Sequence, residues 1–397
     1  MIDRLAIFTG IPAFPQPLHV GRPNVVDRQG FLSRVEAILD SRWLTNNGPV
    51  VREFEHAVAQ ITGVRNCVAV CNGTIGLEIL IRALDLSGEV IVPSFTFAAT
   101  PGALAWLGLT PVFCDVDPST HNLFPGGIEE HITSRTTGIL GVHIWGRACA
   151  TDELAAIARR HSLELIFDAA HAFGCTSGGV PIGGFGEAEV FSFHATKYAN
   201  AFEGGMIATN NDDLAERLRR IRNFGFQDVD HVVEIGINGK MSEVAAAMGL
   251  TSLEHLAEVV AVNSENYQRY SDGLTGIPGV RVVTFDRRES HNYQYVVAEI
   301  DEVEAGLDRD GLMRVLHAEN VLARRYFYPG CHQLEAYQSL PGRASPSLPA
   351  TEALVCRTIC FPTGTAVGAA DIARIASIVA RAVDQSGMVK DQLAGLI

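Results

Sequence analysis

The sequence lacks several features that mark other classes of protein. Only 19% of its 397 residues are charged, and acidic residues outnumber basic ones, so the formal net charge is -14 and the pI is near 5.4. Binding to nucleic acid or to anionic membranes requires a basic surface, so neither partner is expected. No apolar run reaches membrane-spanning length, and Met1-Ile2-Asp3-Arg4 does not begin a signal peptide. These absences predict a cytoplasmic protein.

Cysteine is present but gives no sign of a disulfide framework. None of the eight cysteines forms a CxxC pair and most lie in apolar segments, so we expect reduced, mostly buried thiols. Cys67/Cys71 and Cys356/Cys360 have the i,i+4 spacing of a helix face, but no His or acidic partner accompanies them, so no metal is predicted. The others are Cys114, Cys149, Cys175 and Cys331.

Common nucleotide-binding motifs are also missing. No GxGxxG follows the first predicted strand and no GxxxxGK[ST] occurs, which removes the main support for a nicotinamide or P-loop site. The glycine-rich segment 178–186 contains Pro181 and has irregular spacing. It therefore favours a hairpin or turn over a phosphate loop.

Short β-branched segments alternate with helix-like segments through roughly the first 250 residues. This alternation predicts an α/β protein whose mainly parallel sheet is covered on both faces. Ligands of such sheets bind at the carboxyl ends of the strands. The predicted strands are 68–70, 90–92, 110–113, 137–142, 163–167, 190–193 and 206–208.

The remaining segments predict three parts. Residues 1–20, with Pro12, Pro15 and Pro17, form an extended arm without a core of its own. Residues 21–250 form the large domain. A long helix predicted over 242–256 leads out of it into the next part. Residues 251–397 form a smaller α+β domain.

Lys197 is the most informative residue. It ends Phe191-Ser192-Phe193-His194-Ala195-Thr196-Lys197, follows a strand that ends in Asp168, and precedes Glu203-Gly204-Gly205. A loop amine whose pKa is lowered can form a Schiff base with a carbonyl cofactor, and a buried carboxylate can keep a pyridine nitrogen protonated. A single lysine is most often a solvated surface residue, but this combination indicates a pyridoxal phosphate (PLP) enzyme.

Cys71-Asn72-Gly73-Thr74 is the best candidate for a phosphate site. It joins the end of a predicted strand to the start of a predicted helix. Free N–H groups and the helix dipole would hold a dianion there, and the Thr74 hydroxyl would add a donor. The alternative is an ordinary helix N-cap.

Together these segments resemble the DegT/DnrJ/EryC1/StrS family of PLP-dependent nucleotide-sugar aminotransferases. The likeness extends from Trp43-Leu44-Thr45-Asn46-Asn47-Gly48-Pro49 to Ile359-Cys360-Phe361-Pro362. It implies the aspartate aminotransferase fold (fold type I), with a mainly parallel seven-stranded sheet flanked by helices and a smaller α+β C-terminal domain. The motifs that carry it are Asn72-Gly73-Thr74, Pro93-Ser94-Phe95-Thr96-Phe97, Asp168-Ala169-Ala170-His171, Ser192-Phe193-His194-Ala195-Thr196-Lys197 and Glu203-Gly204-Gly205.

The resemblance assigns roles to individual residues. Lys197 would be the Schiff-base lysine and the base that moves a proton between the substrate carbon and the cofactor. Asp168 would pair with the pyridinium nitrogen. The remaining cofactor contacts would be Phe97 on the ring face, His171 near the phenolic oxygen, and Gly73, Thr74 and Ser192 at the phosphate.

The resemblance also implies a homodimer. In the family an Asn reaches the phosphate from the neighbouring subunit, and Ile237-Asn238-Gly239-Lys240-Met241 matches that motif at Asn238. The active site would then be shared between subunits. The aromatic residues that usually flank this Asn are Ile237 and Gly239 here, which changes the side chains available to the sugar nucleotide.

Five residues are candidates for substrate binding. Trp145 stands where Tyr is common and would shape the sugar pocket, with core packing as the alternative. Arg147 would contact substrate or form a surface ion pair. Arg324 and Tyr326 lie in a segment that resembles the family's substrate wall, and adjacent arginines suit a diphosphate or a glutamate carboxylate. His194 completes this set.

The implied reaction transfers an amino group from L-glutamate to C-4 of a dTDP-4-keto-6-deoxyhexose, giving dTDP-4-amino-4,6-dideoxyglucose for deoxyaminosugar and antibiotic biosynthesis. His194-Ala195-Thr196-Lys197 followed by Glu203-Gly204-Gly205 favours C-4, because many C-3 enzymes resemble Tyr-Pro-Thr-Lys…Gly-Asp-Gly-Gly. The alternatives are a C-3 keto-sugar aminotransferase and a non-catalytic PLP-binding regulator. Lys197 argues against a C-3 dehydratase, which has His at that position.

Overall fold

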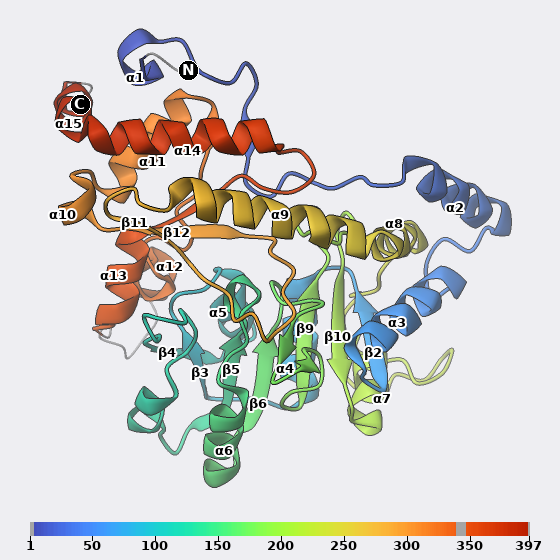
Figure 1. The fold of residues 1–397 in the computed structure, drawn as a ribbon. Coiled ribbons are helices and arrows are strands. Elements are labelled where there is room, and N and C mark those ends of the chain that lie inside the picture. Colours follow the sequence, from blue (N-terminus) through green and yellow to red (C-terminus); the bar gives the residue numbers. More distant parts are fainter. Residues whose placement is uncertain (1–3, 339–346, 396–397) are drawn as a thin grey trace.

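The structure is built around a seven-stranded sheet. The computed structural model describes residues 4–338 and 347–395 (Figure 1). The strand order is β2-β10-β9-β6-β5-β3-β4, and only β10 runs antiparallel to its neighbours, so the predicted α/β class and mainly parallel sheet are confirmed. The strands are β2 (Asn66–Val70), β3 (Glu89–Pro93), β4 (Thr110–Cys114), β5 (Thr136–Val142), β6 (Glu164–Asp168), β9 (Ala188–Ser192) and β10 (Gly205–Thr209).

Both faces of this sheet are buried, which explains why its strands are nearly continuous apolar runs. Successive residues of β2 point to opposite faces. Val68 and Val70 pack in the core beneath α4, α5 and α7, whereas Cys67 and Ala69 pack beneath α3 and α8. The covering helices are α3 (Pro49–Thr62), α4 (Gly73–Ala83), α5 (Ala99–Trp106), α6 (Thr151–His161), α7 (Asp212–Ile221) and α8 (Glu243–Glu254), with α2 (Arg28–Ser41) packed against α8.

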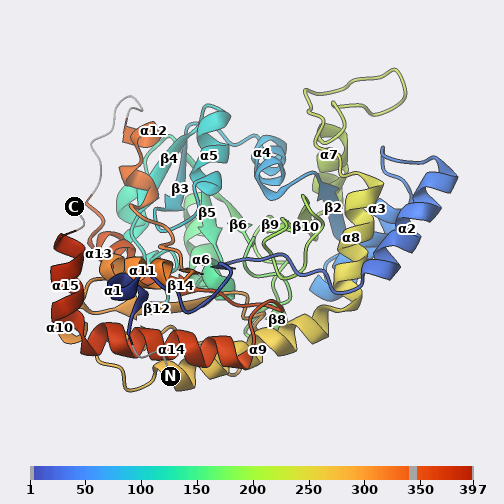
Figure 2. The same ribbon diagram turned by 90° about the horizontal axis from the view of Figure 1, so that it is seen from above.

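The C-terminal part has a three-stranded antiparallel sheet of its own, in the order β11-β12-β14. The two long helices α9 and α14 lie side by side against it (Figures 1 and 2). Its elements are α9 (Leu256–Leu274), β11 (Val280–Val282), β12 (Val296–Ile300), α10 (Glu302–Ala305), α11 (Arg309–Ala318), β13 (Val321–Leu322), α12 (Glu335–Gln338), α13 (Pro349–Arg357), β14 (Thr358–Phe361), α14 (Ala369–Asp384) and α15 (Ser386–Ala394).

The N-terminal arm completes this C-terminal core. Leu5 and Phe14 are buried in the same cluster as residues of α14. The short β1 (Leu18–His19) pairs in parallel with β13. The buried carboxylate of Glu319 accepts hydrogen bonds from the backbone N–H groups of Ala6 and Ala13, both at 2.7 Å. The apolar residues of this segment therefore pack on the far end of the chain.

The predicted helix over 242–256 corresponds to α8, after which the chain bends by 62° into α9. Within residues 4–338 and 347–395, no single helix is long and apolar enough to cross a membrane, and α8 and α9 meet the length and composition required only together, as this bent pair. The division between the two domains near residue 250 stays a prediction.

The glycine-rich segment forms a hairpin, as predicted, between β7 (Thr176–Ser177) and β8 (Val180–Pro181). Two carboxylates of this chain already accept hydrogen bonds from its backbone N–H groups, so those donors are not free to hold a phosphate. Gly178 and Gly179 donate to Glu289 at 2.8 and 3.1 Å, and Gly183 and Phe185 donate to the buried Glu189, both at 2.8 Å.

Replacing Glu319 by Ala should loosen the N-terminal arm. Each backbone donor left without a partner costs about 1–3 kcal/mol when buried, so the melting temperature should fall and a protease should cleave the arm faster than in the parent protein. Glu304→Ala, at an exposed acidic residue of α10, is the control and should change neither property. Equal cleavage of Glu319→Ala and parent would contradict the anchoring role.

Candidate active site

A cavity of about 450 Å³ opens at the carboxyl ends of the parallel strands. Asp168 ends β6, Ser192 ends β9, and Gly73 follows β2, so three strands deliver side chains to one place, as the sheet topology predicts. Ten of the predicted site residues line this cavity, namely Gly73, Thr74, Phe97, Asp168, His171, Ser192, His194, Lys197, Arg324 and Tyr326.

The turn before α4 combines the two interpretations that its sequence allowed. The side chain of Asn72 caps the helix by accepting from the N–H of Ile75 at 2.9 Å. Gly73 and Thr74 are the first two residues of α4 and line the cavity. A helix N-terminus that faces a cavity favours a bound anion, so the N-cap and a phosphate site coexist here.

Two glycines allow the backbone to close around this turn. A Cβ on Gly73 would lie 3.3 Å from the Cβ of Ser192. A Cβ on Gly205, at the start of β10, would lie 2.6 Å from the carbonyl carbon and oxygen of Asn72 and 2.8 Å from the nitrogen of Gly73. Because those are backbone atoms, any side chain at residue 205 would displace the turn.

Asp168 is buried and accepts two hydrogen bonds. The Thr100 hydroxyl donates to one carboxylate oxygen at 2.7 Å and the Ala170 N–H donates to the other at 3.0 Å. Burial raises the pKa of Asp168, and these bonds together with the Lys197 charge act in the opposite direction. In the described residues Asp168 forms no ion pair, so a protonated ring nitrogen would supply a cation that this chain itself does not.

Lys197 lines the same cavity, with its amine 3.1 Å from the hydroxyl of Tyr295. Burial lowers the pKa of Lys197 to about 8, although the Asp168 charge acts to raise it. The short loop that carries it is closed by a bond from the Lys197 N–H to the His194 carbonyl at 2.8 Å. A lysine with this pKa has far more neutral amine near pH 7 than an ordinary surface lysine.

His171 is held on three sides. Its Nδ1 accepts from the Trp145 N–H at 3.3 Å, its Nε2 lies 3.2 Å from the Tyr295 hydroxyl, and its carbonyl accepts from Asn292 and Gln294. Burial, followed by the nearby Lys197 charge, holds the pKa of His171 well below its usual range. The ring is therefore neutral.

Three further predicted residues line the cavity with free surface. The Phe97 side chain is 59% exposed, so its ring is available to stack on a ligand. His194 contacts the Thr196 hydroxyl at 2.8 Å and Glu203 at 3.5 Å. The Arg324 guanidinium lies 5.4 Å from the centre of the Tyr326 ring.

The second of the adjacent arginines does not line this cavity. Arg325 donates to Asp310 at 2.9 Å and covers the Tyr328 ring at 4.2 Å. Arg324, in contrast, is tied to β14 through backbone bonds with Cys360 and lines the cavity beside Tyr326. Only one of the two arginines that the sequence suggested is therefore available to a ligand in this cavity.

Three predicted residues lie outside the cavity lining. Trp145 is fully buried and packs against both His171 and Phe327, so the structure shows core packing, and direct contact with substrate stays a prediction. Arg147 donates to the Ser119 carbonyl at 3.0 Å. Asn238 pairs with Asn223 in an isolated antiparallel β-bridge and is not among the residues that line the cavity of its own chain.

Tyr295 and Thr100, which contact the two charged groups of the site, are not among the residues predicted from the sequence. Tyr295 lies just before β12 and about a hundred residues after Lys197, and Thr100 lies in α5. Neither residue stands in one of the sequence motifs that predicted the site.

Comparisons with known proteins agree with this geometry. The sequence pattern of the DegT/DnrJ/EryC1/StrS aminotransferase family matches residues 26–380. A dTDP-4-amino-4,6-dideoxy-D-glucose transaminase of Shigella dysenteriae is 37% identical over 322 residues, covering 81% of this chain and 88% of that protein. The Escherichia coli protein of that name is 32% identical over 363 residues, covering 91% and 97%.

A solved structure extends the likeness to the whole chain. The structure of DesI in the presence of its TDP-sugar product has 50% sequence identity and a TM-score of 0.95, covering 99% of this chain and 100% of that chain. The expected aspartate aminotransferase-like fold is thus confirmed. The chain belongs to the DegT/DnrJ/EryC1/StrS aminotransferase family and is a PLP-dependent aminotransferase.

Proposed function

We propose that this protein transfers the amino group of L-glutamate to C-4 of dTDP-4-keto-6-deoxyglucose, giving dTDP-4-amino-4,6-dideoxyglucose. The observation that carries this proposal is the single cavity that combines the low-pKa Lys197 with the buried Asp168. The printed names of the two transaminases and of DesI with its TDP-sugar product support the substrate class.

The residues of the cavity fit PLP. Gly73, Thr74 and Ser192 would hold its phosphate, Asp168 its ring nitrogen, and Lys197 its carbonyl carbon. Bound PLP supplies an electron-withdrawing ring that accepts the electron pair left when a proton leaves the substrate carbon. Phe97 and His171 line the same cavity, and we assign them to the ring face and the phenolic oxygen.

The chain's own part in the reaction is proton transfer and positioning. With a pKa of about 8, about one Lys197 side chain in ten is a neutral amine at pH 7, compared with far fewer for an ordinary lysine. This amine can take a proton from the donor and return it to the acceptor. Asp168 remains ionised beside a cationic ring nitrogen, because that charge would offset the effect of burial on its pKa.

The substrate end of the cavity is defined by Arg324, Tyr326 and His194. The nucleotide sugar and glutamate are both anionic, whereas the chain carries a net charge of -14. A local cation is therefore needed, and we assign Arg324 to a diphosphate or carboxylate of the substrate.

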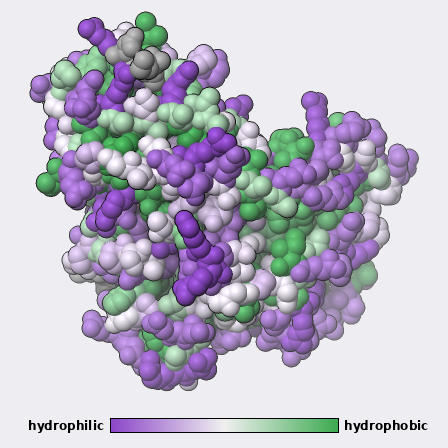
Figure 3. All heavy atoms as spheres, in the orientation of Figure 1, coloured by the Kyte–Doolittle hydropathy of each residue, from purple (hydrophilic) through white to green (hydrophobic). Residues whose placement is uncertain are grey.

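We propose a homodimer whose two active sites are shared. A loop carrying exposed valines and isoleucines projects beyond α7 and ends at Asn238 (Figure 2). Hydrophobic residues also gather right of centre on the face shown in Figure 3, over the region of α3 and α8. Such patches on a monomer mark an interaction surface. The exposed residues of the loop are Val229, Val232, Val233, Ile235 and Ile237.

The partner subunit would bring its own loop to this cavity. Asn238 lies outside the cavity of its own chain, so we assign it to the phosphate bound in the other subunit. We further propose a cytoplasmic location, which is supported by eight free cysteines, six of them buried.

The reaction can be followed in the two half-steps. Protein loaded with PLP should absorb at roughly 410–430 nm, shift towards roughly 330 nm with L-glutamate, and recover when dTDP-4-keto-6-deoxyglucose is added. Product NMR should place the amine on C-4. Recovery without a C-4 amine would move the assignment to C-3. If L-glutamate shifts the absorbance but the keto sugar does not restore it, this sugar is excluded as the substrate. If a cofactor band that depends on Lys197 is changed by no amino donor, the protein is a regulator.

Gly205→Ala should weaken PLP binding by about tenfold or more, because an overpacked site costs about 1–3 kcal/mol. The added methyl group would displace the Asn72–Gly73 turn that forms the phosphate site. Titrating the apoprotein with PLP measures the affinity, and circular dichroism checks the fold. Gly387→Ala, on an open face of α15, is the control. Unchanged affinity in Gly205→Ala would remove this turn from the cofactor site.

Subunit complementation tests the shared site. Lys197→Ala and Asn238→Ala should each be nearly inactive alone. A heterodimer of the two has one intact site, because Lys197 from one chain meets Asn238 from the other, so random mixing should restore about a quarter of parental activity. Light scattering should show a dimer. Differently tagged heterodimers that remain inactive would place Asn238 outside the partner's site.

A further inference from the structure

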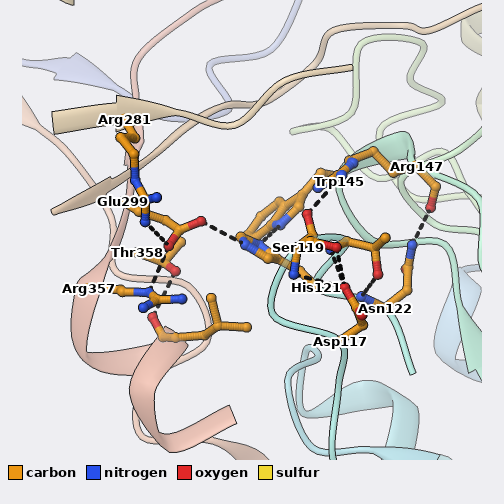
Figure 4. A network of polar contacts seen from close by, with 12 residues as sticks. Asp117, Ser119, His121, Asn122, Trp145, Arg147, Arg281, Glu299, Arg357 and Thr358 are labelled. Atoms are coloured by element: carbon orange, nitrogen blue, oxygen red, sulfur yellow. Dashed lines mark hydrogen bonds and ion pairs between the residues drawn. The ribbon is translucent and has the colours of Figure 1, made fainter. Parts of the chain in front are cut away.

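A series of hydrogen bonds, joined through Trp145, connects Glu299 of β12 to Lys197. We call it the relay, and Figure 4 shows its outer half. Its links are Glu299 Oε1 to His121 Nε2 at 3.2 Å, His121 Nδ1 to the Trp145 indole at 3.1 Å, the Trp145 N–H to His171 Nδ1 at 3.3 Å, His171 Nε2 to the Tyr295 hydroxyl at 3.2 Å, and that hydroxyl to Lys197 Nζ at 3.1 Å.

Two donors in the relay have a fixed direction. An indole N–H and a backbone N–H can only donate, so Trp145 donates to Nδ1 of His121 and to Nδ1 of His171. Each imidazole therefore carries its hydrogen on Nε2. His121 then donates to Glu299 and His171 donates to the oxygen of Tyr295.

This direction determines what Tyr295 presents to Lys197. Burial raises the pKa of Tyr295 well above its usual value, so the hydroxyl keeps its hydrogen. Its oxygen accepts from His171, and it also accepts from Nζ when Lys197 is an ammonium group; when Lys197 is neutral, the hydroxyl hydrogen can turn to Nζ instead. A neutral amine can accept that hydrogen, whereas an ammonium group cannot. The relay thus favours the neutral form of Lys197.

The conformation of Trp145 depends on its anchors. Its φ of 61° is in the left-handed region, which a bulky residue rarely adopts. The His121 bond and the Phe95 and Phe327 rings hold the indole in place. The next residue, Gly146, also has a positive φ, and a Cβ there would lie 3.0 Å from the His171 carbonyl. Holding the indole therefore aims the Trp145 N–H at His171.

The C-terminal part supplies both ends of the relay. Tyr295 and Glu299 are four residues apart along one extended segment that includes β12, so they point to the same face. The ion pairs of Glu299 with Arg357 at 2.7 Å and Arg281 at 3.5 Å neutralise its charge. The hydrogen bond from His121 and these arginines lower the pKa of Glu299 despite its burial, so it is an ionised acceptor.

We propose that His121 and Glu299 are positioning residues, which set the direction of the hydrogen bonds in the relay so that Tyr295 donates to the amine of Lys197. This positioning role rests on the proposed function in one respect, because it takes Lys197 as the group that carries the proton. It concerns the lysine itself, so it can be tested without either substrate.

Breaking the relay should raise the pKa of Lys197. Without a fixed Trp145 N–H, His171 can carry its hydrogen on Nδ1 and accept at Nε2 from Tyr295. The hydroxyl then turns its oxygen lone pairs towards Lys197, where they favour the ammonium form. The titratable and charged groups outside the relay that line the same cavity are Asp168, His194, Glu203, Arg324 and Tyr326. They are unchanged, and the Asp168 charge already acts in the same direction.

The chain is well suited to this measurement because it has only three lysines, Lys197, Lys240 and Lys390. Full-length protein stripped of PLP is treated with cyanate over a range of pH, and mass spectrometry gives the modification rate of each lysine. In the parent, Lys197 should reach half-maximal reactivity near pH 8. His121→Phe should move this midpoint upward by about one pH unit. Lys390, whose side chain is half exposed, is the internal control and should not change.

A double-mutant cycle separates the relay from a general disturbance. In a Tyr295→Phe background, His121→Phe should no longer move the Lys197 midpoint, because the hydroxyl that transmits the change is missing. Trp145→Phe, which lacks the indole N–H, is the second variant in case His121→Phe does not fold. A parental midpoint in folded His121→Phe, or an equal shift with and without the Tyr295 hydroxyl, would overturn the proposal. Either result would leave the aminotransferase assignment untouched.

Discussion

The active site depends on the burial of two opposite charges in one cavity. Burial raises the pKa of Asp168 and lowers that of Lys197 to about 8, and each charge partly offsets the effect of burial on the other. A lone buried charge would be neutralised. The bonds from Thr100 and Ala170 to Asp168, and between Tyr295 and Lys197, keep a carboxylate and a reactive amine together. The same hydrogen bonds also orient the Asp168 carboxylate and the Lys197 amine.

The sheet explains why distant motifs meet. Parallel strands bring Asp168 and Ser192 to one edge, where the first turn of α4 also begins. Because β10 is antiparallel to its neighbours, its first residue, Gly205, lies at that same edge, paired with Val70 and Ser192. The two backbones approach so closely that no Cβ fits at residue 205. The Asn72-Gly73-Thr74 and Glu203-Gly204-Gly205 motifs therefore pack directly against each other, through the backbone of Gly205 and that of Asn72 and Gly73.

The sequence predicted best what depends on local pattern. Strands buried on both faces gave continuous apolar runs, and Lys197 and Asp168 stood in motifs whose order along the chain was sufficient to place them on one cavity. Tyr295 could not be predicted, because its role depends on β12 packing against residues about a hundred positions earlier. The burial of Leu5 by the C-terminal helices was equally invisible, since it depends on contacts more than three hundred residues apart.

Trp145 illustrates how packing and chemistry are joined in this molecule. The family commonly has Tyr at this position, and a tyrosine hydroxyl can both donate and accept, whereas an indole can only donate. With Trp, the bond to His121 has one possible direction. The bond to His171 also has one direction, but it comes from the backbone N–H, which any residue except Pro would supply. A residue that lies outside the cavity therefore determines which nitrogen of His171 carries hydrogen. Burial of Trp145 and a role in the site are thus compatible, because it acts through its neighbours.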